Sequence, residues 1–549
     1  MTLEQIVNAS EADQVSIHSL PDDILRVIFW INTFRKNEDA FYNHSTTLAS
    51  AQVCQRWRAV ALDYSALWSR IIDYERHSSS WIETLLARSG SSLIDVGGDS
   101  VLEPVKLENP RGEPVLQSIF QRISTLRTVS LHIRRAPWES ICHSFFGHPV
   151  PNLEYLNLIT SCPFPDCIYP GPFFANEAPR LRRLHLQRCL IDFSSSVLFN
   201  LTELSVWNVQ APNPVLSTSD PSKATPSVAG WLEVLKNIST LRFLTLSDAI
   251  SHFTEQTPLP VLNLPHLVLL TIRTRFHPGI SFIDHLSIPS SCGIRLIFSR
   301  DYNGSGGFDS PKLLSFLSQQ FTHWRQDHSD RYLQAKALTG NTIRFGNSRR
   351  IGQVFDKTES DEVEAHSRYS KDPMLSLVFY FGSSQDSFPF FNQLLELYSF
   401  TFSTTTTLDF WLDREFANLA TTPGYFPSFQ TFHSFTNVKT LHILEQSPFY
   451  LLPLFQNFSL PDHPLFPALQ LLCLSGTNMD DEQGALYSVF VAFLRWRAEA
   501  RTPLPEIEIL SGSISSKTAK DLSRFGNVRI TQRRAATSFS PDSDGSVRY

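Results

Sequence analysis

Apolar residues near the N-terminus repeat at helical spacing and predict a short amphipathic helix. Pro21 suits the first turn, because its missing N–H is not needed there. The carboxylates of Asp22 and Asp23 follow it and suit the positive end of the helix dipole. The next apolar positions fall at i, i+1, i+4 and i+5, which places them on one helix face. They are Ile24, Leu25, Ile28 and Phe29.

A second amphipathic segment begins near Leu48 and is followed by a hydrophobic anchor, Leu67 and Trp68. Its apolar face would hold Val53, Trp57, Val60, Ala61 and Tyr64. A module of about 60 residues has difficulty burying this many large apolar groups within itself. An exposed apolar surface on such a module typically marks a protein interface. A helical core with no further role is the simpler alternative.

Beyond residue 100 a short phrase recurs, with apolar residues at its first, fourth and sixth positions. If Leu, Ile and Val together fill roughly one position in five, about five copies are expected by chance in a chain of this length. Stronger signals are a proline two residues before four copies and the pentapeptide Ile-Ser-Thr-Leu-Arg, which occurs twice. The copies begin at Leu126, Leu153, Leu181, Leu201, Leu241, Leu267, Val438 and Leu469.

The last two apolar positions of each copy alternate, as on a short strand with one buried face. The spacing of the early copies fits leucine-rich repeats. The position three residues beyond each copy should turn inward, and it is small in only some copies, so the repeat is irregular. It holds Ser161, Cys189, Ala249 and Thr477, but also Arg134, Arg275 and Gln446. Helical patterns lie between copies, at 228–238, 313–324, 390–398 and 486–500.

These patterns predict a helical module at 16–72, a connector at 73–100 and a degenerate repeat array at 101–530. Residues 276–434 fit the repeat poorly, and a separate inserted domain there is the alternative. Residues 531–549 are mostly Ser, Asp and Arg without an apolar pattern, which predicts a disordered tail. Strand-like runs are expected at 294–298, 375–381, 407–410 and 506–510, with an acidic stretch at 356–364.

Composition narrows the class of protein. The chain is 42% hydrophobic and 18% charged, which predicts a globular fold. Its net charge of −6 gives no reason to expect nucleic acid as a partner. No apolar run of membrane-spanning length occurs, and the polar N-terminus does not resemble a signal peptide. Seven scattered cysteines suit a reducing compartment, so we expect an intracellular protein of the cytoplasm or nucleus.

Catalytic and metal-binding motifs are absent from the sequence. There is no nucleophile elbow, phosphate-binding loop or dinucleotide fingerprint. His132, His185 and His442 should share one face of the strands, but as polar surface residues rather than ligands. Cys162 and Cys167 have no second pair to complete a zinc site. We therefore expect no catalytic residue, no metal and no cofactor, and the protein is not expected to be an enzyme.

The N-terminal motifs resemble an F-box, and most closely the F-box proteins abundant in mushroom-forming fungi. The resemblance covers about residues 16–72, and the polar linker at 30–48 is longer than usual for that family. The family fold would be a three-helix F-box followed here by an irregular leucine-rich-repeat α/β solenoid, an α+β repeat protein. The matching positions, expected to form the core or the partner-binding face, are Leu20, Pro21, Ile24, Leu25, Ile28, Phe29, Val53, Cys54, Trp57, Leu62 and Trp68.

The resemblance implies a function as well as a fold. In that family the F-box binds the Skp-type adaptor of a cullin-RING ubiquitin ligase. The chain would then be the substrate-recognition subunit of an SCF-type ligase, with an unknown protein target on its repeats and neither nucleic acid nor membrane as a partner. One alternative is a repeat scaffold or regulatory protein that binds the adaptor without delivering a substrate. A less favoured alternative is an enzyme within 276–434.

Overall fold

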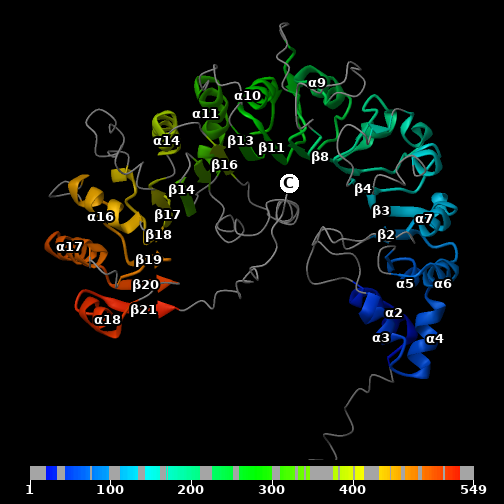
Figure 1. The fold of residues 1–549 in the computed structure, drawn as a ribbon, viewed down its shortest axis with the longest axis horizontal. Coiled ribbons are helices and arrows are strands. Elements are labelled where there is room, and N and C mark those ends of the chain that lie inside the picture. The colour runs from blue at the N-terminus through cyan, green and yellow to red at the C-terminus, as the bar shows by residue number, and fades with distance from the viewer. Residues whose placement is uncertain are drawn as a thin grey trace, which may run out of the picture. The chain divides into compact units, whose positions relative to one another are not determined.

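A computed structural model gives the fold, and its described residues form two compact units (Figure 1). The first lies within Met1–Ser251, and the second within His252–Lys357 and Ser370–Tyr549. The structure describes residues 20–33, 44–73, 77–97, 112–133, 142–160, 168–169, 171–209, 225–251, 259–299, 310–327, 332–338, 342–346, 375–380, 384–399, 402–412, 432–444, 447–458, 464–479, 485–510 and 514–531.

The first unit opens with a module of short helices. The described helices are α2 (Asp22–Asn32), α3 (His44–Ser50), α4 (Gln55–Asp63) and α5 (Ser65–Trp68). The expected second amphipathic segment is therefore two helices with a break between them. Hydrogen bonds place that break: the hydroxyl of Ser50 donates to the carbonyl of Thr46 within α3, and the Cys54 thiol then accepts from the Trp57 N–H. A side chain in that capping position starts a new helix.

A parallel sheet follows the module in the first unit. Each described strand pairs with the next in parallel, in the order β1-β2-β3-β4-β6-β8-β9. The expected connector at 73–100 contains α6 (Ser79–Ser89) and the second strand. The strands are β1 (Ile72–Asp73), β2 (Ile94–Gly97), β3 (Leu126–Ile133), β4 (Tyr155–Thr160), β6 (Arg183–Gln187), β8 (Glu203–Trp207) and β9 (Phe243–Ser247).

The repeated phrase accounts for this sheet. Every copy of the phrase contains a strand, as expected, and its apolar positions are buried. In the third copy, for example, Leu181, Leu184 and Leu186 are all fully buried. Because side chains alternate along a strand, the residues between them face the other side of the sheet. The strand prediction from the phrase is confirmed.

Helical segments cover the leucine side of this first sheet. Five buried phenylalanines cluster at the short segments, and the rings of Phe120 and Phe145 stack with centroids 4.6 Å apart. The others are Phe146, Phe173 and Phe174. The helix α9 (Val228–Lys236), expected at 228–238, buries Trp231, whose indole N–H donates to the carbonyl of Ala249 at 2.7 Å. The other segments are α7 (Gly112–Phe120), η2 (Ile123–Thr125), η3 (Cys142–Phe146), η4 (Phe173–Asn176) and η5 (Ser196–Asn200).

The second unit contains a longer sheet that is mostly parallel. Its described strands lie in the order β11-β13-β16-β15-β14-β17-β18-β19-β20-β21. They are β11 (Leu269–Arg275), β13 (Gly293–Ser299), β14 (Tyr332–Leu338), β15 (Thr342–Gly346), β16 (Leu375–Tyr380), β17 (Thr407–Leu412), β18 (Thr440–Leu444), β19 (Leu471–Ser475), β20 (Glu506–Leu510) and β21 (Asn527–Thr531).

One strand of this sheet runs against the others. Strand β15 is antiparallel to both its neighbours, β14 and β16, and these three strands lie in reverse of their chain order. The neighbours on either side, β13 and β17, pair in parallel with β16 and β14. The poor repeat signature of 276–434 therefore coincides with an antiparallel hairpin, and the described strands of that region belong to the same sheet as their flanking strands.

Helices flank the second sheet as they do the first. Helix α10 approaches strand β13 so closely that a Cβ added to Gly279 would lie 2.4 Å from Cε1 of Phe298, so glycine is needed there. The helices are α10 (Phe276–Asp284), α11 (Ser310–Asp327), α14 (Ser384–Tyr398), α16 (Ser447–Phe458), α17 (Ala485–Glu499) and α18 (Ser516–Leu522). Two small parallel pairs complete the units: β5 (Ile168–Tyr169) with β7 (Leu190–Ile191), and β10 (Leu262–Asn263) with β12 (Leu286–Ser287).

The expected inward position beyond each phrase is only partly regular. Cys189, Ala249 and Thr477 are buried there, as their small size predicts. Arg275 instead precedes α10 and is only half-buried. The other positions of this set lie outside the described residues: Ser161, Arg134 and Gln446. The expected tail beyond residue 531 lies outside them too. Thr531 itself is the last residue of β21.

Candidate protein-docking surface

The start of α2 is held by the start of α4. Pro21 precedes the first helical residue, and Asp22 and Asp23 lie in the first turn, as expected. The Arg56 guanidinium contacts the Asp22 carboxylate at 2.6 Å and also donates to the carbonyl of Leu20. This pair of contacts fixes the N-terminal ends of the two helices against each other.

An aromatic core holds the same two helices together. The rings of Phe29 and Trp57 meet edge to face with centroids 5.2 Å apart. Leu25 lies beside them on α2 and is fully buried. At the end of the module the Trp68 indole N–H donates to the carbonyl of Ala61 at 2.7 Å. Burial of a side chain of this size stabilises a fold by about 1.5–3 kcal/mol, so these residues hold the module together.

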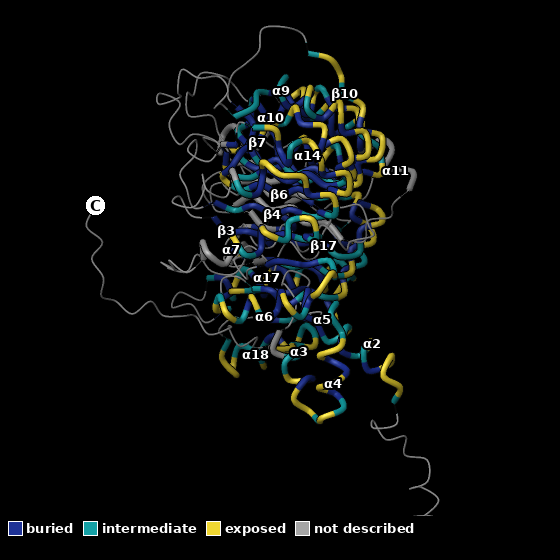
Figure 2. Tube along the Cα trace, turned by 90° about the vertical axis from the view of Figure 1, so that its right-hand side faces the viewer, coloured by how far each residue is buried: buried dark blue, intermediate teal, exposed yellow. Residues whose placement is uncertain are grey.

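The opposite face of α2 is apolar and exposed. Ile24, Val27 and Ile31 are 41%, 52% and 59% exposed, and their spacing of three and four residues aligns them along the helix. We call these three residues the apolar strip. Figure 2 shows exposed stretches on α2 and α4 at this end of the unit. The expectation of one apolar face is thus wrong for Ile24, because α2 has a buried face and an exposed one.

Helix α4 adds two more exposed apolar groups. Val53 precedes the Cys54 cap and is 59% exposed, so it does not share the buried face of Trp57 that its spacing suggested. The helix break between α3 and α4 moves it off that face. Leu62 lies in the last turn of α4 and is 43% exposed. It adjoins Asp63, whose carboxylate pairs with Arg26 of α2 at 2.5 Å.

The structure therefore divides the expected positions by burial. Leu25, Phe29, Trp57 and Trp68 are buried and form the core. Pro21, Ile24, Val53 and Leu62 are exposed, while Leu20, Ile28 and Cys54 are half-buried. Sequence reasoning missed Val27 and Ile31, although their spacing from Ile24 carried a signal. The large apolar side chains that are exposed among the described residues number ten, and five belong to this module: Ile24, Val27, Ile31, Val53 and Leu62.

Neither a family model nor a curated protein matches this chain. Its functional interpretation therefore rests on the geometry of the molecule. Within the described ranges, no group of three or more His, Cys, Asp and Glu side chains could hold a metal ion. No helix in the same ranges is long and apolar enough to cross a membrane. An exposed apolar surface on the N-terminal module remains the most distinctive feature.

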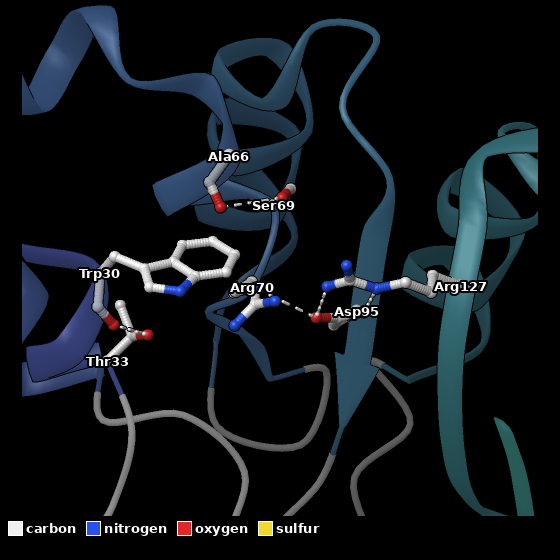
Figure 3. A network of polar contacts seen from close by, with 7 residues as sticks. All are labelled: Trp30, Thr33, Ala66, Ser69, Arg70, Asp95 and Arg127. Atoms are coloured by element: carbon white, nitrogen blue, oxygen red, sulfur yellow. Dashed lines mark hydrogen bonds and ion pairs between the residues drawn. The ribbon is translucent and has the colours of Figure 1, made fainter. Parts of the chain in front are cut away.

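A buried carboxylate links this module to the sheet of the first unit (Figure 3). The Arg70 guanidinium stacks on the Trp30 ring, 3.3 Å from its centroid, and lies 3.6 Å from the Asp95 carboxylate. Arg127 of β3 binds the same carboxylate through two nitrogens, at 2.9 and 2.5 Å. The Asp95 side chain is 1% exposed. Arginines therefore pair with this carboxylate from both sides, and an unpaired charge at this burial would be strongly destabilising. The contacts run continuously from α2 to β3.

Of the three histidines singled out in the sequence, His132 and His185 lie in the first unit and are not paired in the strand register. His185 of β6 pairs with Asn157 of β4 and Ser205 of β8. The β3 residue at that level is Ser130, and His132 lies two residues beyond it. His442 belongs to the second unit. His185 Nε2 lies 2.8 Å from a Glu203 carboxylate oxygen, and its Nδ1 lies 3.4 Å from the Tyr155 hydroxyl. His185 is thus part of a polar cluster on the non-leucine face.

A second polar row crosses the sheet of the second unit. Asp409, His442, Cys473 and Glu508 lie at matched register on β17 to β20. The Cys473 thiol donates to the Glu508 carboxylate at 3.6 Å. Burial, and then the Glu508 charge, raises the pKa of Cys473 to about 12. A thiol with that pKa stays protonated at neutral pH, so the row lacks an active nucleophile.

We predict that Cys292 and Cys473 resist alkylation in the folded protein. Burial raises the pKa of each thiol to about 12, so at pH 8 only about one molecule in ten thousand carries the thiolate. Iodoacetamide followed by peptide mass spectrometry should find both unmodified in the native chain and modified after unfolding in urea. Rapid native labelling of either cysteine would contradict the burial described here.

Proposed function

We propose that this chain is the substrate-recognition subunit of an SCF-type ubiquitin ligase. Its N-terminal module would be an F-box that docks on a Skp-type adaptor, which in turn binds a cullin scaffold. Its two sheets would belong to an irregular leucine-rich-repeat solenoid that holds a protein target. Such a subunit contributes proximity rather than chemistry, because it brings a target near a charged ubiquitin-transfer enzyme.

The observation that carries this proposal is the concentration of exposed apolar groups on the N-terminal module. Five of the ten large apolar side chains that are exposed among the described residues lie there, although the module is only about a tenth of the chain. A concentration of exposed apolar groups is typical of a docking site. The motif residues that resemble an F-box also divide as a docking module requires, into a buried core and an exposed set.

The repeated parallel strands support the second half of the proposal. Within each unit, neighbouring strands carry polar residues in aligned rows on the face opposite the leucines. One such row, on β4, β6, β8 and β9, is Asn157, His185, Ser205 and Thr245, and its first three residues are buried. Repeat arrays bind proteins on their extended surfaces, so the support comes from the repetition of the strands and not from this buried row.

Affinity purification from cells tests the proposal. A chain with Leu20→Ala and Pro21→Ala should recover at least tenfold less of the Skp-type adaptor and the cullin than the wild type does. Both residues lie at the accessible entrance to α2, and truncation removes apolar contact there. Proteins that both chains recover would include the target.

Two outcomes would count against a ligase receptor. Undiminished adaptor recovery by the double variant would remove the docking role from this module. Adaptor recovery without the cullin or polyubiquitinated partners would instead favour a scaffold that binds the adaptor and delivers no substrate.

A further inference from the structure

Four arginines gather at the strand starts of the first sheet without a carboxylate partner. We call them the arginine rim: Arg180, Arg182, Arg183 and Arg242. Arg183 is half-buried and the others are exposed, and none of the four forms an ion pair with a described residue. Backbone hydrogen bonds run from Arg242 to Thr202 and from Thr202 to Arg182, each at 2.8 Å. Arg182 and Arg242 are thus two strands apart at one level, a separation of about 10 Å.

Three carboxylates lie near the rim, and two of them, Asp95 and Glu203, contact other side chains. The third, Glu154, lies beside Arg182, just before the neighbouring strand β4, and forms no ion pair with a described residue. Arg127 stands at the equivalent place of its own phrase, and Asp95 binds it through two hydrogen bonds. Glu203, which lies opposite Arg183 in the strand register, contacts His185 at 2.8 Å. With the two carboxylates Glu154 and Glu203 counted against the four arginines, the rim keeps a local charge of +2, although the whole chain has a net charge of −6.

Three of the four guanidinium groups are held in place by uncharged contacts. Arg183 lies over the Tyr155 ring at 4.6 Å, and Arg242 lies over the Phe243 ring at 5.8 Å. Arg182 Nη1 donates to the carbonyls of Pro179 and Leu181, at 3.0 and 3.1 Å. A guanidinium that rests on a ring keeps its edge N–H groups free for a carboxylate. It also loses less conformational freedom when a partner binds.

We propose that the arginine rim binds an acidic segment of the target protein. This inference rests on the proposed function, since it names the chemistry of the target that the chain would recognise. An extended segment rises about 3.3 Å per residue, so Asp or Glu side chains three residues apart match the 10 Å between Arg182 and Arg242. The negative charge of the rest of the chain would disfavour such a segment elsewhere, which gives the rim selectivity.

A labelled peptide tests this site on the full chain. The probe is a fluorescein-labelled peptide with Glu at every third position among Gly and Ser, and its partner probe has Gln in place of Glu. Fluorescence polarisation should show binding of the Glu probe that weakens with added salt, and no binding of the Gln probe. Arg182→Glu with Arg242→Glu should weaken the Glu probe at least about tenfold, which is 1.4 kcal/mol.

Arg188→Glu is the matched control, because Arg188 is an exposed arginine just past the opposite end of β6. The control should bind the probe as the wild type does. Equal affinity of the rim variant and the wild type would overturn the proposal, and so would an equal loss in the control. If the double charge reversal fails to fold, Arg182→Gln with Arg242→Gln replaces it. This variant should also bind the Glu probe more weakly than the wild type and the control do.

Adaptor recovery from the same preparations keeps the two proposals separate. The rim variant should retain the adaptor, because the apolar strip is unchanged. If the wild-type chain recovers the adaptor but does not bind the Glu peptide, only the proposal for the arginine rim is overturned. If the wild-type chain binds the Glu peptide but recovers no adaptor, only the proposed ligase function is overturned.

Discussion

A chain with Ile24→Asp and Val27→Asp should recover no detectable Skp-type adaptor while its sheets stay folded. Both side chains are about half exposed, so a partner that buried the exposed half would gain about 1 kcal/mol per side chain. Loss of both contacts would cost about 2 kcal/mol, a factor of about thirty in affinity. The two new carboxylates would also resist burial. Binding of the purified adaptor, measured by calorimetry, checks this.

The control is Val261→Asp, which changes another exposed apolar residue in the second unit. Val261 is 68% exposed, so the substitution adds a similar charge without touching the module. Circular dichroism and thermal unfolding should match the wild type in both chains. Normal adaptor affinity in the double variant would show that the apolar strip is not the docking surface.

Asp95→Ala should strongly loosen the junction between the helical module and the sheet. The Arg70 and Arg127 side chains are only 9% and 22% exposed, so both would stay largely buried without their counter-charge. Removing one member of a buried ion pair costs about 3–5 kcal/mol. Hydrogen exchange followed by mass spectrometry should show faster exchange of the β2 and β3 amides by about that free energy.

Two further variants are compared with Asp95→Ala. Asp63→Ala removes an ion pair whose partners are 43% and 73% exposed, and it should cost less than about 1 kcal/mol. Replacing Arg70, Asp95 and Arg127 together by Met, Leu and Met removes every charge and should restore most of the protection. Unchanged exchange in Asp95→Ala would contradict the role assigned to this carboxylate.

Much of the sheet could be read from the sequence, because one face of each strand is buried. Leu204 and Leu244 repeat at a fixed place in the phrase, and the strands follow it. The phrase says nothing of strand direction, so the antiparallel β15 could not be foreseen. Pairing in that region joins segments distant in the chain, and neither Thr342 nor Leu375 lies in a copy of the phrase.

The docking surface was harder to foresee, since helical spacing alone does not tell which apolar face is inside. Ile24 and Leu25 are neighbours in the sequence, yet one is 41% exposed and the other fully buried. The difference comes from Trp57, whose ring packs against Phe29 and selects the Leu25 side. Arg70 was overlooked as well, because its importance depends on Trp30 and Asp95 from other elements.

The antiparallel hairpin of β14 and β15 explains how the number of strands in such a sheet can change. Excising β14 and β15 would leave β16 beside β13, still parallel to it, with β17 as the next strand in the chain. Two added strands restore the original direction, whereas one would not. A ladder of this kind can therefore gain or lose strands in pairs during evolution while every later turn of the chain keeps its orientation.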